Sequence, residues 1–474
     1  MNKMKNILFV FITILGGFCS CAQQQHLSTG ISNNGPKAYP AAEGFGRYTI
    51  GGRGGRTYIV SNLNDKGPGS FREAAEAKEK RMIVFALSGT IHLETKLSIA
   101  GNVTIAGQTA PGDGICLADQ SVMIGGNNII VRYLRFRMGD KYQKGGMVDG
   151  NGGDDAFGGT GKRNIIIDHC SLSWSTDEVF SVYNGDSTTL SWNLIAEPLN
   201  YSYHYETGDK DYEHHGFGAI WGGRHLSAHH NLFAHCNNRN PRFNGNRQGI
   251  DEYVDYRNNV IYNWGGNNIY AGEGGHYNLV NNYFKYGPET KESVKFRICN
   301  PGRTATIPFG KWYVDGNYVD GSIENTENNW RAVDIDKNYS TPKDSIRMDI
   351  AFDNMGLPVE GAKSAYQSVL AGVGCNFPYR DTMDKRILRN VVERTGRFAD
   401  VQGGYPHGTS YEETILAWPA LGSKKAPLDS DQDGIPDEWE IKHKLDPHDA
   451  ADAARFTLNN DYTNLEVYIN SLVS

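Results

Sequence analysis

The sequence has no two cysteines separated by two residues, the spacing typical of zinc ribbons and redox centres. It holds seven cysteines in 474 residues, and two of them, Cys19 and Cys21, lie in the N-terminal segment. The remaining five are odd in number and widely spaced, so they support neither a disulfide scaffold nor a cysteine-bound zinc ion. We interpret them as buried structural thiols: Cys116, Cys170, Cys236, Cys299 and Cys375.

The sequence also lacks an excess of basic residues. It has 47 Lys and Arg against 54 Asp and Glu, a formal net charge of −7. This balance carries no electrostatic footprint for nucleic acid, so we expect no nucleic-acid partner, although an acidic polymer can still bind through a local cluster of Arg and Lys. Aromatic residues make up 11% and glycines number 56, which indicates a sizeable core and many tight turns.

The long apolar run ILFVFITILGGF lies at the N-terminus, after Lys3 and Lys5. It is too short and too early for a membrane span, and predicts a secretory signal over residues 1–21, followed by a polar tether over residues 22–37. Its end, FCSCAQQQ, is similar to a lipoprotein signal, which predicts lipidation of Cys21 and an outer-membrane anchor. Ordinary cleavage after Ala22 is the alternative. In either case we expect the mature protein outside the cytoplasm: on the surface or periplasmic face of the outer membrane, in the periplasm, or secreted.

Between residues 38 and 320, short β-branched runs recur around a central residue, as in TTLSWNLIAEP and YVDYRNNVIYNW. Successive central residues are 23, 38, 28, 23 and 35 positions apart. Such a period with inserted loops predicts an all-β solenoid, a right-handed parallel β-helix. Asparagine suits the corners because it tolerates a left-handed backbone and its amide can bond to the next coil. The aligned central residues are Cys170, Asn193, Asn231, Asn259, Asn282 and Asn317.

The pattern changes after residue 320. The stretches SAYQSVLAGVG and TMDKRILRNVVERTG have the apolar spacing of helices. We expect residues 321–426 to form a helical and irregular segment packed on the solenoid. Pro427 marks the start of an acidic C-terminal module over residues 427–474.

The stretch DSDQDGIPDEWE in this module fits the calcium-loop pattern D-x-D-x-D-G-x₅-E in full. Calcium takes roughly six to eight oxygen ligands, and this spacing wraps a loop so that they converge. A solvated acidic linker is the alternative, but carboxylates so close together repel one another. No helix is evident before the loop, so it is more similar to thrombospondin type 3-like calcium repeats than to an EF-hand, and we expect a structural role. The predicted ligands are Asp429, Asp431, Asp433, the Ile435 carbonyl, Asp437 and Glu440.

The stretch IIIDHCSLSWSTDEVF begins as an apolar strand and places Asp168, Asp177 and Glu178 close behind it. Alternation points Asp168 outward, and Asp177 can return to the same face after one turn of chain. About three coils later stand Arg239 and Arg242, and equivalent positions of a solenoid stack into one stripe. Two carboxylates and two guanidinium groups on one stripe predict a cation site beside an anion clamp, suited to a carboxylate-bearing substrate. Asp–Arg pairing on a solvated surface is the alternative.

IIIDHCSLSWSTDE resembles the W-I-D-H signature of the pectate lyases, polysaccharide lyase family 1, and RNPRFNG resembles their R-x-P-x-x-R signature. The stretches AYPAAEGFGRYTIGGRGG, LNDKGPGSFREA, IVFALSGTI and TIAGQTAPGDGI are similar to the bacterial, Bacteroidetes-type branch of that family. The likeness runs from about Tyr39 to Tyr318, and the helical tail with its calcium loop also recurs there.

The resemblance implies a β-helix that cleaves α-1,4-linked galacturonan, as in pectate or pectin, by β-elimination and leaves 4,5-unsaturated oligosaccharides. It implies Ca²⁺ as cofactor, bridging protein carboxylates and the uronate carboxylate. Carried across by motif, Asp168 and Asp177 are calcium ligands and Arg239 is the base that removes the C5 proton. Arginine is an unusual base because its guanidinium holds the proton tightly, so neighbouring cations must weaken that hold.

This sequence departs from the family pattern at three positions. Ser181 stands where a second Asp is often found, so Glu178 can supply the missing ligand. Asn244 replaces the second arginine, so Arg242 can supply that charge. The substrate-binding lysine has no clean match, which leaves as candidates His215 and Lys210.

Two other functions remain open at the sequence level. GGDDAFG and HHG echo elements of β-helix polygalacturonases, which are glycoside hydrolases, but their R-I-K element is missing. The substitutions at Ser181 and Asn244 also fit a galacturonan-binding β-helix that has lost catalysis.

Overall fold

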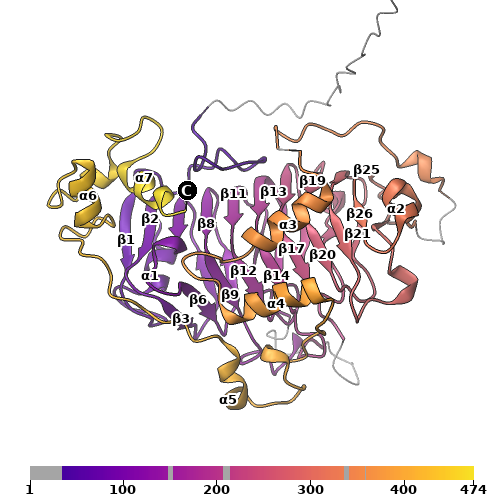
Figure 1. Cartoon of the computed structure of the whole chain (residues 1–474), viewed down its shortest axis with the longest axis horizontal. Coiled ribbons are helices and arrows are strands. Elements are labelled where there is room, and N and C mark those ends of the chain that lie inside the picture. Colours follow the sequence, from indigo (N-terminus) through magenta and orange to yellow (C-terminus); the bar gives the residue numbers. More distant parts are fainter. Residues whose placement is uncertain (1–34, 148–152, 206–213, 336–340, 358, 474) are drawn as a thin grey trace, which may run out of the picture.

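The computed structural model describes residues 35–147, 153–205, 214–335, 341–357 and 359–473. The predictions for the signal segment, the tether and Cys21 lie outside these residues, as does Lys210. The chain winds into coils that each contribute strands to three parallel sheets, named here A, B and C (Figure 1). The predicted parallel β-helix is confirmed.

Sheets A and C meet in one long strand. In β13 (Phe180–Ser191), the first half pairs within sheet C and the second half within sheet A. The other strands of sheet A are β1 (Arg56–Val60), β2 (Arg81–Phe85), β5 (Val103–Ala106), β8 (Ile129–Arg132), β11 (Arg163–Asp168), β16 (Leu226–His229), β19 (Tyr253–Arg257), β22 (His276–Val280) and β25 (Lys311–Asp315). The other strands of sheet C are β4 (Leu97–Ile99), β7 (Val122–Ile124), β10 (Phe157–Thr160), β15 (Ile220–Gly223), β18 (Arg242–Phe243), β21 (Ile269–Ala271) and β24 (Cys299–Pro301).

Sheet B carries one strand from each coil. Its strands are β3 (Gly89–His92), β6 (Ile115–Ala118), β9 (Leu134–Arg137), β12 (Ser171–Ser173), β14 (Leu194–Ala196), β17 (Leu232–Ala234), β20 (Val260–Tyr262), β23 (Tyr283–Lys285) and β26 (Tyr318–Val319). Alternation along these short strands sends Ile195 and Phe233 into the solenoid and Leu194 and Leu232 outward.

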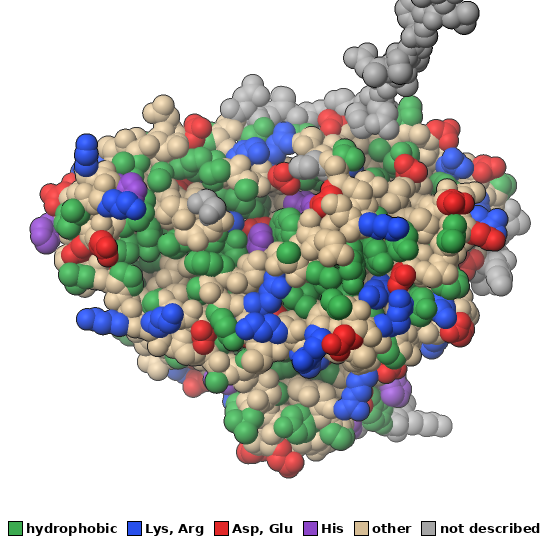
Figure 2. Space-filling model, in the orientation of Figure 1, with side chains coloured by type: hydrophobic (Ala, Val, Ile, Leu, Met, Phe, Trp, Pro, Cys, Tyr) green, Lys and Arg blue, Asp and Glu red, His purple; other side chains and the backbone are tan. Residues whose placement is uncertain are grey.

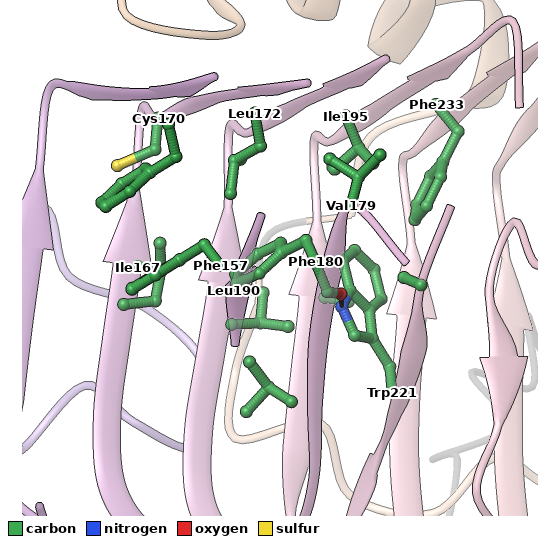
Figure 3. Packing of buried hydrophobic residues seen from close by; sticks show 14 of the residues in the cluster. Phe157, Ile167, Cys170, Leu172, Val179, Phe180, Leu190, Ile195, Trp221 and Phe233 are labelled. Carbon is green, nitrogen blue, oxygen red and sulfur yellow. Dashed lines mark hydrogen bonds between the residues drawn. The ribbon is translucent and has the colours of Figure 1, made fainter. Parts of the chain in front are cut away.

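The interior of the solenoid is a column of apolar side chains stacked coil on coil. Phe136, Phe157 and Phe180 form a continuous stack, with ring centroids 4.1 Å and then 5.6 Å apart. Figure 3 shows Phe157 and Phe180 beside Ile167 and Leu190 of neighbouring strands. Each coil therefore buries its apolar face only because the next coil covers it, which is the basis of solenoid stability.

The aligned asparagines form a buried ladder between sheets A and B. Each side-chain amide donates to the carbonyl oxygen of the next asparagine, from Asn193 through Asn231, Asn259, Asn282 and Asn317 to Asn329, at 2.9–3.1 Å. The Cys170 N–H donates to Asn193 at the start of the ladder. The predicted amide bonding between coils is therefore confirmed.

The left-handed residues at this corner stand one position before the ladder. His169, Trp192 and His230 have φ of 52°, 56° and 56°, while the ladder asparagines that follow do not have positive φ. In later coils the left-handed residue at this position is itself an asparagine, Asn258 with φ of 56° and Asn281 with φ of 54°. Asparagine therefore has both predicted properties at this corner, but on adjacent residues. The rings at the left-handed positions stack from coil to coil, with centroids 5.5 Å apart for His169–Trp192 and 4.3 Å for Trp192–His230.

Helices cover the solenoid from outside. Helices α3 (Ala362–Gly372) and α4 (Thr382–Glu393) lie across sheet B and bury its outward apolar residues (Figure 1). Asp381 caps α4 and forms a buried ion pair with Arg137 of β9 at 2.7 Å. Figure 2 shows Lys and Arg side chains over α4 on the solvent side. The remaining helices are α1 (Phe71–Glu76), α2 (Ile323–Glu327), α5 (Tyr411–Thr414), α6 (Asp437–His443) and α7 (Asn464–Ser471).

In the described part of the chain, no helix combines the length and apolarity that crossing a membrane requires.

Replacing Asn259 by Ala tests the ladder. Asn259 accepts from the backbone and side chain of Asn231 and donates to Ala228 and Asn282, so its loss leaves several buried polar groups without partners. We expect Asn259→Ala to lower the free energy of unfolding by about 2 to 4 kcal/mol in urea titration. Asn64→Ala, at an exposed loop position, is the matched control. Equal stability of the two variants would contradict a stabilising role for the ladder.

Candidate functional site

A group of ionisable side chains gathers where the strands of sheet C begin, on successive coils. Glu178 pairs with Phe217 of the next coil, and Phe217 pairs with Asn238 of the coil after it, as parallel bridges. On the other side, the Ala156 N–H donates to the Glu178 carbonyl at 3.2 Å. Asp155, Glu178 and Arg239 are therefore brought together by the stacking of coils.

Three carboxylates converge at this point. Oxygen atoms of Asp155, Asp177 and Glu178 all lie within 4.8 Å of one another, a spacing that a divalent cation can bridge. Burial, together with the charge of Asp177, raises the pKa of Asp155 well above its usual range. The cluster is thus electrostatically unfavourable by itself, and a cation fits its donor set of hard oxygens.

Arg239 lies directly beside this cluster. Its backbone is left-handed, with φ of 58°, and its N–H donates to the Asn238 side-chain oxygen at 2.8 Å. The guanidinium forms an ion pair with Glu178 and lies over the ring of Phe217, 4.2 Å from its centroid. With 22% of its side-chain surface exposed, Arg239 is within reach of a ligand from solvent.

Asp177 is held by histidine. His215 Nε2 lies 2.7 Å from the Asp177 carboxylate, and the His215 ring stacks on His204 at 3.8 Å. Burial opposes ionisation of Asp177, but the bond to His215 and the charges of His215, His204 and Arg239 leave the pKa of Asp177 below its usual value. His215, a predicted candidate for binding substrate, therefore lies at the site and is the partner of a carboxylate.

The predicted anion clamp is largely neutralised. Arg242 lies on β18 and its Nη2 is 3.3 Å from Glu273, which also pairs with Arg247 at 2.7 Å. Asn244 donates to Gln248 at 2.7 Å within its own turn. Arg242 and Arg247 thus share the single negative charge of Glu273, and β18 pairs with β15, which separates it from β13 in sheet C.

Ser181 occupies the position of the expected second Asp. Its hydroxyl accepts from the Ile220 N–H at 3.0 Å, and a hydrogen bond from it favours the charged form of Asp155. Gly158 lies opposite Ser181, and a Cβ there would be 2.4 Å from the Ser181 carbonyl oxygen. The bare backbone at Gly158 lets Asp155 approach the next coil closely.

Asp155 was missed as a ligand by the sequence reasoning. Its motif, GGDDAFG, was interpreted only as an echo of a hydrolase. The signal in the sequence is the pair Asp154 and Asp155, which stands just before a strand and one coil before Asp177. The carboxylate of the neighbouring Asp154 accepts hydrogen bonds from Lys96 at 2.6 Å and from Gln143 at 2.8 Å.

Asp168 does not join the cluster. It lies on β11 in sheet A, 2% exposed, where it contacts Arg132 at 3.0 Å, His169 at 2.9 Å and Ser191 at 2.7 Å. Burial opposes its ionisation, but the charges of His169 and Arg132 outweigh that effect and lower the pKa of Asp168. It points outward as predicted, but Tyr39 covers Arg132 there, with 3.8 Å between guanidinium carbon and ring centroid. Asp168 therefore holds a structural ion pair in this fold.

The C-terminal acidic loop brings together four of the five side chains that the motif predicts as ligands, and Asp437 is not among them. Asp429, Asp431 and Asp433 form one group with oxygens within 4.8 Å, and Asp433, Glu440 and Asp452 form a second. Burial and the charges of neighbouring acids raise the pKa of Asp433 to about 7 and that of Glu440 to about 8. The loop thus has the donor set of a calcium site.

The Asp168 ion pair yields a test of its role. We expect Asp168→Asn to cost about 3 kcal/mol of unfolding free energy at pH 7, because it leaves Arg132 buried without a counter-charge. Since the pKa of Asp168 is lowered by folding, its stabilisation is complete above the unfolded value of about 3.9 and declines as the pH falls further. Urea titrations should therefore show the difference from wild type shrinking below about pH 4. A loss of calcium binding with unchanged stability would instead restore Asp168 as a ligand.

No protein-family model matches the chain. Its curated relatives include the probable pectate lyase C of Aspergillus flavus, 33% identical over 468 residues, covering 96% of this chain and 97% of the relative. The probable pectate lyase C of Aspergillus fumigatus is 34% identical over 457 residues, covering 92% and 94%. Among solved structures, the major allergen from cedar pollen is similar over 73% of this chain and 97% of its own, with 20% identity and a TM-score of 0.48. A pectate lyase bound to hexasaccharide has 14% identity, a TM-score of 0.48 and coverage of 73% and 99%.

Proposed function

The chain belongs to the pectate lyase family, and on that premise we propose that it cleaves α-1,4-linked galacturonan by β-elimination, with Arg239 as the base. The observation that carries the proposal is the convergence of Asp155, Asp177 and Glu178 beside Arg239 on adjacent coils. A cation site next to a guanidinium group suits a substrate with a carboxylate on the reacting sugar.

Asp155, Asp177 and Glu178 are the residues that would hold Ca²⁺. When bound, Ca²⁺ supplies positive charge that binds the uronate carboxylate and makes the C5 proton more acidic. In the proposed reaction Arg239 takes the C5 proton, the electron pair of that bond forms the C4–C5 double bond, and the C4–O bond breaks. The departing oxygen takes up a proton and becomes the new hydroxyl end, so the products are one saturated and one 4,5-unsaturated chain.

Glu178 has a second role in this proposal. It is the ion-pair partner of Arg239, the proposed base. The same carboxylate has an oxygen within 4.8 Å of oxygens of Asp155 and Asp177, so a cation held there would compete with the guanidinium for it. Such a cation would add positive charge beside the guanidinium, which is what an arginine base requires.

The geometry favours a lyase over the two alternatives. An inverting hydrolase needs two carboxyl groups roughly 6.5–9.5 Å apart to admit a water molecule, whereas oxygens of these three carboxylates lie within 4.8 Å of one another. A binding module without catalysis has no need for half-buried, mutually repelling carboxylates, which destabilise the fold. The expected partner is the acidic plant polysaccharide homogalacturonan, in pectate or pectin.

Replacing Arg239 by Ala tests the base. We expect wild type with polygalacturonate and calcium to show rising near-ultraviolet absorbance from unsaturated ends, which a chelator abolishes. Arg239→Ala should lower this rate roughly a thousandfold, since general-base catalysis is commonly worth 10²–10⁴-fold. The matched control is Arg163→Ala, on the exposed start of β11, which should keep the wild-type rate.

Other outcomes of this assay identify the alternatives. New reducing ends without absorbance would indicate hydrolysis, and polymer binding with neither signal would indicate a binding module. More than a tenth of wild-type activity in Arg239→Ala would remove Arg239 from the role of base.

The N-terminal segment gives a proposal for location. We infer export from the cytoplasm and attachment to the outer membrane through a lipid on Cys21, supported by the sequence FCSCAQQQ. In a Gram-negative host, wild type should fractionate with membranes and Cys21→Ser should be soluble, because the acyl chains supply the attachment. A soluble wild-type protein would instead favour cleavage after Ala22.

A further inference from the structure

The acidic loop of the C-terminal module holds buried carboxylate oxygens without hydrogen-bond partners. Both oxygens of Asp431 and both of Glu440 are in this state, as are Asp433 Oδ2 and Asp452 Oδ1. Glu440 is fully buried, and Asp433 and Asp452 are 3% and 5% exposed. Buried charged groups are normally paired, so these oxygens point to a cation that they share.

One residue of the motif is turned away from this centre. Asp437 accepts from the Ser430 N–H at 2.7 Å and from the Ser430 hydroxyl at 2.6 Å, on the exposed side of the loop. Both of its oxygens are therefore used to close a turn. The motif assigns a ligand to this position, and the structure gives that residue another task.

Asp452 lies within the carboxylate group, where the motif places Asp437. It lies beyond α6, in the segment that leads to α7, and its oxygen is within 4.8 Å of oxygens of Asp433 and Glu440. Its other oxygen accepts from the Asp446 N–H at 3.2 Å, which fixes the side chain. We propose that Asp452 replaces Asp437 as a calcium ligand, and that the ion joins two segments of the module and latches it onto the first coils of the solenoid.

The acidic loop itself packs against the first strands of the solenoid. The Ile435 side chain is fully buried in an apolar cluster with Met82 and Val84 of β2. At Gly434 a Cβ would lie 3.0 Å from Thr57 and 3.2 Å from Val84, so the turn of the loop rests on β1 and β2. The residues that hold the ion are therefore continuous with those that cover the outer side of sheet A.

Helix α7 belongs to the same contact. Figure 1 shows α7 beside β2. Leu465 and Ile469 of α7 join the apolar cluster, and Glu466 forms a buried ion pair with Arg53 at 2.9 Å. Asn464 at its start donates to the Asp452 carbonyl at 2.9 Å. A ligand at Asp452 thus couples ion binding to the placement of α7 on β1 and β2.

The test compares Asp452→Asn with Asp437→Asn in the full-length mature protein. Each change removes one charge, and Asp452→Asn keeps an acceptor for the Asp446 N–H. Asp437→Asn keeps an acceptor for the Ser430 N–H and an NH₂ group that the Ser430 hydroxyl can accept from. We expect calorimetric titration with Ca²⁺ alone to show a binding event that Asp433→Asn abolishes. Asp452→Asn should weaken that event at least tenfold, and Asp437→Asn should leave it within about twofold.

Hydrogen exchange supplies the readout of the latch, independent of lyase activity. In wild type and Asp437→Asn, Ca²⁺ should protect the amides of Met82–Phe85 and Leu465–Ile469, and Asp452→Asn should need more Ca²⁺ for the same protection. Circular dichroism shows whether Asp452→Asn folds, and Asp452→Glu should recover part of the affinity.

Three results would overturn the proposal. Weakened binding in Asp437→Asn with normal binding in Asp452→Asn would restore the motif's own ligand. An unchanged titration in Asp433→Asn would mean that the loop holds no ion. Protection of Met82–Phe85 that does not respond to Ca²⁺ would mean that the ion has no part in docking.

Discussion

The coil-to-coil register is the constraint on which the rest of this structure depends. In a parallel β-helix every strand must pair with the equivalent strand of the next coil, whatever the length of the loops between them. The asparagine ladder holds that register at one corner, because each buried amide bonds to the amide above it. A slip by one residue would turn interior side chains outward along a whole coil.

The same register assembles the functional site. Asp155, Glu178, Phe217 and Arg239 are far apart in the chain, yet lie on adjacent coils because their strands begin at the same level of sheet C. Like charges placed so close together destabilise the fold, and the pairing of Glu178 with Arg239 and of Asp177 with His215 offsets part of that cost. The rest of that destabilisation is offset by the packing of the solenoid.

The parts of this fold that follow from a local repeat could be predicted from the sequence. The ladder asparagines were found because each one follows a β-branched run at a fixed place in the coil. Asp168 was predicted to share a stripe with Asp177, but it lies on another face, because alternation tells inside from outside and not which of three outer faces a residue occupies. Asp155 and Asp452 depend on loops whose paths have no periodic signal. Sequence spacing therefore predicted the strands well and the composition of the site only in part.

The two acidic clusters differ in a way that separates their proposed roles. At the proposed catalytic cluster, Asp177 has His215 and Glu178 has Arg239, so these carboxylates have partners within the protein. In the C-terminal loop, Asp431 and Glu440 have no hydrogen-bond partner for either oxygen. A cation at the first cluster must compete with those partners. A cation in the C-terminal loop displaces no hydrogen-bond partner of Asp431 or Glu440. We therefore expect Ca²⁺ to exchange readily at the proposed catalytic cluster and to bind more tightly in the C-terminal loop.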